Sequence, residues 1–217
     1  MARINACGCA LCLVLPYAVG CSIGSPGELG KGGFTTNCTS EDSSCSYSFT
    51  GQALPSYVAV GSSLAVDYSG QMASAASAGA RVVPASTLFA RAASDGVHFL
   101  APGTVALLAR SSSVVVDDFV HVQVQPIDDL KIDGPSSLYL TEDGKYSVTA
   151  YSVDHNALAG SLPFVWSTST PELVSMTGSF SDTARVTLHP EKAGRGALRV
   201  QVGGTLSDLN ITVREKP

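Results

Sequence analysis

The chain has 217 residues and a formal net charge of −5; 45% of its residues are hydrophobic and only 14% are charged. This composition is too apolar for a disordered chain, and the length suits one or two domains with their own cores. The 13 Lys and Arg residues form no basic stripe, so we expect no nucleic acid partner.

The first twenty residues have the pattern of a secretory signal peptide. Residues 1–5 carry one Arg, and the uncharged run ACGCALCLVLPYAVG follows at 6–20. This run is shorter than the roughly 20 residues that a membrane-spanning helix needs, but it matches the apolar region of an export signal. The alternative is a buried core segment, although such a segment rarely begins at residue 6 behind a basic tip.

The apolar run ends in AVGC at 18–21, which resembles the lipobox of bacterial lipoprotein precursors. The resemblance implies cleavage between Gly20 and Cys21, followed by attachment of membrane lipid to the Cys21 thiol and to the new amine. The alternative is cleavage by the ordinary signal peptidase, which leaves Cys21 as a free thiol. In Gram-negative families an Asp after the cysteine commonly marks retention in the inner membrane, so Ser22 implies the outer membrane.

Residues 21–45 are predicted to be a flexible tether that contains a short disulfide loop. The stretch SIGSPGELGKGG after Cys21 has the glycine- and serine-rich composition of a flexible linker. Three of the six cysteines lie in the signal peptide, so Cys38 and Cys45 form an even pair in an exported chain, which predicts a disulfide. A metal or redox pair is the alternative, but two thiols without a nearby His or further Cys make a poor zinc site.

From residue 46 onward, apolar and polar residues alternate in several segments. The clearest are FVHVQVQ at 119–125, ARVTLH at 184–189, ALRVQV at 197–202 and LNITV at 209–213. Such alternation is typical of antiparallel strands with one buried face. It predicts that the valines of 119–125 point inward and that His121 and His189 point outward.

The chain also repeats itself. Residues 55–68 align with 135–151, and residues 103–124 align with 196–213, at offsets of 80 and 93 residues. An offset of this size, with short strands and turns at regular spacing, predicts an all-β chain with two tandem Ig-like β-sandwiches. We place the first, more divergent sandwich at 46–126 and the second at 127–217, with Pro126 interrupting the strand before the junction.

Residues 128–214 resemble a bacterial Ig-like domain of group 2. The resemblance rests on Gly144 before a strand, the stretch WSTS at 166–169, and a glycine-containing turn before the penultimate strand. It implies that Trp166 is the core tryptophan between the two sheets. A ligand-binding platform is the alternative role for this side chain.

We find no catalytic or metal-binding motif in the sequence. The four histidines, His98, His121, His155 and His189, are far apart, and no phosphate-binding or dinucleotide-binding glycine pattern occurs. We therefore predict no catalytic residue, no metal ligand and no cofactor. An enzyme would need polar side chains converging in one pocket, for example two of these histidines with an Asp.

Acidic residues occur near the expected junction between the sandwiches. Carboxylate oxygens at a domain junction could bind Ca²⁺, but a solvated hinge explains the same residues. The acidic positions are Asp117, Asp118, Asp128, Asp129 and Asp133.

Together these patterns predict a non-enzymatic, membrane-anchored lipoprotein of the cell envelope that serves as a structural, spacer or adhesion module. The alternative is an envelope binding protein for polysaccharide or a protein partner. The binding hypothesis predicts an exposed aromatic cluster. The candidates for it are Tyr57, Tyr68 and Tyr151. Burial of all three would favour the spacer.

Overall fold

The computed structural model describes most of the chain after residue 23, and in that part the fold is all-β, as predicted. No helix in it is long and apolar enough to cross a membrane. The predicted signal peptide and all six cysteines lie outside the described residues. The described ranges are 24–37, 39–42, 52–70, 80–111, 115–177 and 183–216.

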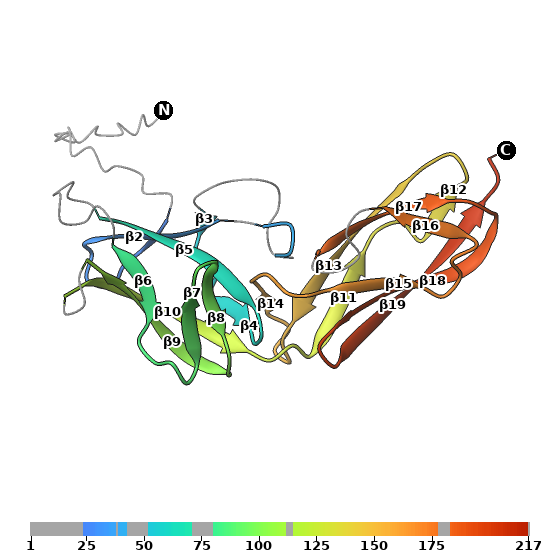
Figure 1. Cartoon of the computed structure of the whole chain (residues 1–217). Helices are drawn as coiled ribbons and strands as arrows, with labels where there is room; N and C mark the ends of the chain where they lie inside the picture. The colour runs from blue at the N-terminus through green and yellow to red at the C-terminus, as the bar shows by residue number, and fades with distance from the viewer. Residues whose placement is uncertain are drawn as a thin grey trace, which may run out of the picture.

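The first β-sandwich has a six-stranded and a four-stranded sheet (Figure 1). The larger sheet has the order β1-β2-β5-β8-β7, with β3 also paired to β2. Its strands are β1 (Ser25–Pro26), β2 (Gly32–Asn37), β3 (Gln52–Ala53), β5 (Ser63–Gly70), β7 (Ala90–Ala93) and β8 (Gly96–Phe99). The smaller sheet has the order β4-β10-β9-β6, with strands β4 (Tyr57–Ala59), β6 (Arg81–Pro84), β9 (Gly103–Arg110) and β10 (Val116–Gln125).

The second β-sandwich has a five-stranded and a four-stranded sheet. The larger sheet has the order β11-β13-β17-β16, with β14 also paired to β13, and the smaller has the order β12-β19-β18-β15. The strands are β11 (Asp129–Asp133), β12 (Ser137–Tyr139), β13 (Gly144–Tyr151), β14 (Ala157–Leu158), β15 (Val165–Thr168), β16 (Val174–Thr177), β17 (Arg185–Pro190), β18 (Gly194–Val202) and β19 (Thr205–Arg214).

The strands of the two sandwiches are connected in a similar order, which explains the sequence repeat. In each, a short strand runs parallel to the last strand: β4 beside β10, and β12 beside β19. The aligned sequence segments also occupy equivalent places, since β5 and β13 each follow these short strands and lie at the centre of the larger sheet. The chain passes from one sandwich to the other between Gln125 and Asp129, where Pro126 was expected to interrupt the strand.

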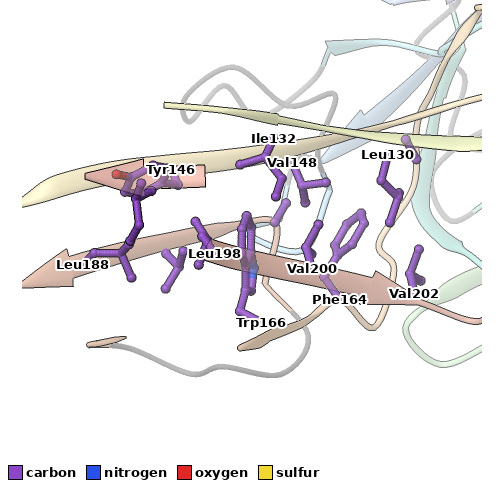
Figure 2. Close-up of a cluster of buried hydrophobic side chains, with 14 of the residues drawn as sticks. Leu130, Ile132, Tyr146, Val148, Phe164, Trp166, Leu188, Leu198, Val200 and Val202 are labelled. Atoms are coloured by element: carbon purple, nitrogen blue, oxygen red, sulfur yellow. The ribbon is translucent and has the colours of Figure 1, made fainter. Parts of the chain in front are cut away.

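The alternating segments bury the predicted faces. Val122 and Val124 are buried in the first core, and Val120 is half-buried against it. Leu198 and Val200 are buried in the second core (Figure 2), as is Ile211. Trp166 lies inside the second core with only 3% of its surface exposed, and its Nε1 donates a hydrogen bond to the Thr183 carbonyl at 2.8 Å. Its surroundings are therefore those of a core tryptophan and not those of a ligand platform.

The predicted flexible tether is wrong for residues 25–37. This segment forms β1 and β2, and β2 pairs with β5 over all six of its residues. The glycines that suggested a linker have a packing role here: a side chain on Gly32 would collide with the ring of Tyr68, which lies over it. The first sandwich therefore begins at Ser25, about twenty residues earlier than predicted.

Tyr146 joins the core to the loop before β12. Its ring is 2% exposed, and its hydroxyl donates to the Pro135 carbonyl at 2.8 Å. Burial raises the pKa of Tyr146 to about 12. An unfolded tyrosine ionises near pH 10, so between these values the unfolded state loses a proton that the folded state keeps, and stability falls as pH rises.

We predict that the Tyr146→Phe variant lacks this alkaline loss of stability. Below pH 10 the variant should be less stable by about 1 kcal/mol, because the hydrogen bond to Pro135 is gone. As the pH rises toward 12, the difference should shrink. Urea unfolding of both proteins at several pH values checks this, and a difference that stays constant or grows would contradict it.

Candidate functional site at the module junction

The contact between the two sandwiches is built from backbone hydrogen bonds. Residues 159–161, directly after β14, extend from the second sandwich onto strands of the first. Ala59 N donates to Ala159 O at 3.0 Å, and Ala159 N donates to Tyr57 O at 3.0 Å. This parallel bridge places Ala159 beside Val58 of β4.

A second bridge reaches the other sheet of the first sandwich. Ser63, at the start of β5, exchanges two hydrogen bonds with Ser161, with N···O distances of 3.1 and 2.8 Å. Residues 159–161 therefore hold both sheets of the first sandwich at once, while β14, just before them, is paired in the second sandwich. A third bridge joins Asp42 to Ser161, so a rotation between the modules would have to break three bridges.

Gly160 allows this close approach. Its φ is +110°, a backbone conformation that residues with a side chain rarely adopt. A Cβ at this position would lie 2.3 Å from Ser62 Oγ. Ser62 is buried, and its hydroxyl donates to the Ala59 carbonyl at 2.7 Å. The turn at 59–63 and residues 159–161 thus fit together only because residue 160 has no side chain.

The junction also joins the hydrophobic cores. Ala59 belongs to the first sandwich by chain position, yet it is fully buried within the core cluster of the second. Tyr57 and Ile127 pack against the same cluster. Two further hydrogen bonds come from the segment before β3: Leu162 N donates to Glu41 O and Ala184 N donates to Ser40 O.

Two hollows flank the junction. The larger, of about 390 Å³, has a mostly apolar lining that also presents the hydroxyl and carboxylate groups of Thr39, Glu41 and Ser161. Thr39 Oγ1 and Ser161 Oγ lie 2.7 Å apart across it. Partial burial raises the pKa of Glu41, but hydrogen bonds from Thr39 and Ser40 outweigh this, so the pKa lies below its usual value. The smaller hollow, of about 280 Å³, is mostly apolar.

Three of the four histidines pair with carboxylates, each with a different one. His98 contacts Asp95 at 2.8 Å, and His121 contacts Glu28 at 2.5 Å. His155 is a turn residue with φ of +58°. In the described part of the chain, no group of three His, Cys, Asp or Glu residues could hold a metal ion.

The third pair extends to a hydroxyl. Asp143 contacts His189 Nδ1 at 2.5 Å, and His189 Nε2 lies 2.6 Å from Thr177 Oγ1. A carboxylate, an imidazole and a hydroxyl in this order resemble a nucleophilic triad, but acyl transfer also needs N–H donors aimed at the developing oxyanion. The strand that carries His189 pairs on both sides, with β13 and β16. We therefore assign this chain of contacts to holding the edge strand β16.

The acidic residues near the junction do not form a calcium site. Asp117 and Asp118 lie at the start of β10, whereas Asp128 and Asp129 follow its end, so the whole strand separates them. Sequence proximity suggested a cluster, but an extended strand of ten residues spans about 30 Å. The Asp133 carboxylate pairs with Lys131 at 3.0 Å.

Asp118 instead holds the loop between β1 and β2. Its carboxylate is fully buried and accepts hydrogen bonds from backbone N–H groups of Leu29, Lys31 and Gly32, at 2.8 to 3.1 Å, and from Phe119 N. Several donors compensate a buried charge that would otherwise be costly. Burial of the phenol raises the pKa of the neighbouring Tyr68, and the negative charges of Asp118 and Asp117 raise it further.

The three candidate tyrosines do not form an exposed aromatic cluster. Each is partly buried, and each packs in a different place. Tyr57 lies against the second core, Tyr68 packs against Phe34 with tilted rings whose centroids are 5.0 Å apart, and Tyr151 ends β13 beside Asp129. They therefore satisfy neither of the two expected outcomes, an exposed patch or complete burial.

The other predicted site residues, Gly20, Cys21, Cys38 and Cys45, lie outside the described residues, so lipidation and the disulfide stay predictions. Sequence reasoning missed the role of Asp118 in holding the β1–β2 loop, and it missed the Ala159–Ser161 junction. The glycine in ALAGSLPF was a usable signal for a tight approach, but nothing local identified its partner.

Comparisons with known proteins find only distant structural similarities. No family model and no curated protein matches this chain. Among solved structures, it is similar to the surface layer protein SbsC, domains 1–6 (15% identity, TM-score 0.36), covering 71% of this chain and 24% of that one. It is also similar to the Yersinia pseudotuberculosis adhesin InvE (14%, TM-score 0.37, 74% and 57% covered) and the Escherichia coli adhesin FdeC (15%, TM-score 0.37, 75% and 62% covered).

The chain thus spans about a quarter of that surface-layer protein and less than two thirds of either adhesin. Identities and TM-scores this low carry no argument about partners or activity.

We predict that Asp118→Asn releases the loop between β1 and β2. In either orientation, the new NH₂ group faces two backbone N–H donors, so the free energy of unfolding should fall by about 3 kcal/mol. Hydrogen exchange of the Lys31 and Gly32 amides should become fast. Asp133→Asn, which removes only an exposed ion pair, is the control and should cost less than about 1 kcal/mol. Unchanged exchange at Lys31 and Gly32 would contradict the assignment.

We predict that Gly160→Ala loosens the junction. Clash with Ser62 and the unfavourable φ should cost about 1–3 kcal/mol and speed hydrogen exchange at Ala59, Ala159 and Ser161. Distances between spin labels, one on each sandwich, should broaden. Gly204→Ala is the matched control, because a side chain there meets no atom within 4 Å. If the two variants behave alike, the junction does not depend on Gly160.

Proposed function

We propose that this chain is a membrane-anchored lipoprotein of the cell envelope, and that its two sandwiches act as a stiff, non-enzymatic structural, spacer or adhesion module. The junction is the observation that carries the proposal. Covalently linked domains move relative to one another by default unless their interface is extensive. Here three backbone bridges and a shared core oppose that motion.

Stiffness suits a spacer because it fixes the distance between the two ends of the molecule. A flexible pair of domains would present its second sandwich at variable distances and angles. The bridges at Ala159 and Ser161 engage both sheets of the first sandwich, so they resist bending in more than one direction. Figure 1 shows the sandwiches end to end, with the described chain starting in the first and ending in the second.

The anchor in this proposal is lipid on Cys21, with the outer membrane as the expected location, and it is open to a direct chemical test. A single acyl chain holds a protein at a membrane only marginally, whereas two or more chains anchor the protein stably. The pattern AVGC after an apolar run supports this part of the proposal.

An envelope binding protein for polysaccharide or a protein partner is the alternative. The hollow lined by Thr39, Glu41 and Ser161 favours it, since hydroxyl and carboxylate groups can bond sugar hydroxyls. The dispersed tyrosines offer such a ligand no common stacking platform. We therefore rank the spacer first.

The mass of the mature protein from membrane fractions tests the anchor. We expect cleavage before Cys21 and the added mass of two or three acyl chains, and release from the membrane in the Cys21→Ala variant. A gain of two protons on reduction would establish the Cys38–Cys45 disulfide separately. An unacylated mass would exclude the lipid anchor, and free release of the parent protein would exclude a spacer held at the membrane.

A further inference from the structure

The described chain starts at one edge of the six-stranded sheet. Strands β1 and β3 both pair with the same side of β2: β1 pairs with Gly33 and Phe34, and β3 pairs with Thr35 and Thr36. The two short strands therefore share one edge, and β3 occupies the place beside Thr35 that a longer β1 would need. Figure 1 shows this start, in blue, beside β2 and β3.

The start of β1 is fixed in place. The Ser25 hydroxyl oxygen accepts a hydrogen bond from Leu54 N at 2.9 Å, close to the end of β3. On the other side of β1, the buried carboxylate of Asp118 holds the following loop, and Glu28 N donates to Phe119 O at 2.8 Å. Strand β1 therefore cannot detach to lengthen the linker without breaking these contacts.

The distance from Cys21 to this edge is short. Gly24 is three residues after Cys21, and a fully extended chain covers at most about 3.6 Å per residue, so Gly24 lies within about 11 Å of Cys21. The polar headgroup region on each side of a bilayer is about 5–8 Å thick. A lipid-bearing Cys21 would therefore hold the sheet edge beside the headgroups.

We propose that the edge formed by β1 and β3 rests on the lipid headgroup layer, with the opposite edge strand, β7, turned away from it. The inference rests on the proposed acylation of Cys21. Terminal strands carry backbone N–H and C=O groups on their outer side, and these groups suit a polar headgroup layer. The anchor thus positions the first sandwich directly on the membrane surface, and the stiff junction passes this orientation to the second.

Tryptophan reporters in the full, processed protein test the proposal. Ala53→Trp in β3 and Pro26→Trp in β1 place a reporter on the proposed edge, and Ala92→Trp in β7 places one on the opposite edge of the same sheet. All three positions are exposed. The native Trp166, buried in the second sandwich, gives the baseline. Each protein is reconstituted in vesicles whose lipid carries a nitroxide quencher on the headgroup, and its acylation is checked by mass.

We expect the quencher to remove most of the added emission from Ala53→Trp or Pro26→Trp and to leave that from Ala92→Trp unchanged. A ten-residue Gly-Ser insertion after Ser22 adds up to about 35 Å of reach and should restore the emission while acylation persists.

Acylated protein without quenching at either edge position would overturn the inference and leave the proposed anchor standing. Equal quenching at Ala92→Trp would overturn the orientation. Quenching that survives the insertion would overturn the role of the short linker. A mass without acyl chains would overturn the anchor and this inference together.

Discussion

Residues 159–161 leave the second sandwich and hydrogen-bond to both sheets of the first, and the relation between the two modules depends on this pairing. Each backbone hydrogen bond contributes only about 0.5–1.5 kcal/mol net, but the bonds act together because one short segment makes all of them. The absence of a side chain at Gly160 is the steric condition for this contact. Ala59 then fills part of the second core, so separating the modules would also expose apolar surface.

The sequence was sufficient for the elements whose signal is local. Alternation in segments such as 197–202 identified the strands and their buried faces, because side chains on a strand alternate between its two sides. The repeat identified two sandwiches because both need the same pattern of strands. Trp166 was placed in the core by its resemblance, and its burial agrees.

The errors concern contacts between residues far apart in the chain. The composition of residues 22–33 indicated a flexible linker, yet Asp118, some ninety residues later, holds the loop that contains Lys31 and Gly32. The same Asp118 was counted among possible calcium ligands because its backbone donors could not be seen in the sequence. The junction was missed for a similar reason: Gly160 marks a tight approach, but only the fold brings Ser62 against it.

These two non-local contacts complement each other mechanically. Asp118 fixes the beginning of the first sandwich, and residues 159–161 fix the second sandwich to it. Between them lie the β-sheets, whose ladders resist extension and shear. If the start of the first sandwich and the junction were both flexible, the two sandwiches would adopt many relative orientations, whatever anchored the chain. Here the hydrogen bonds at both places constrain the position of one sandwich relative to the other, which is the property that the proposed spacer requires.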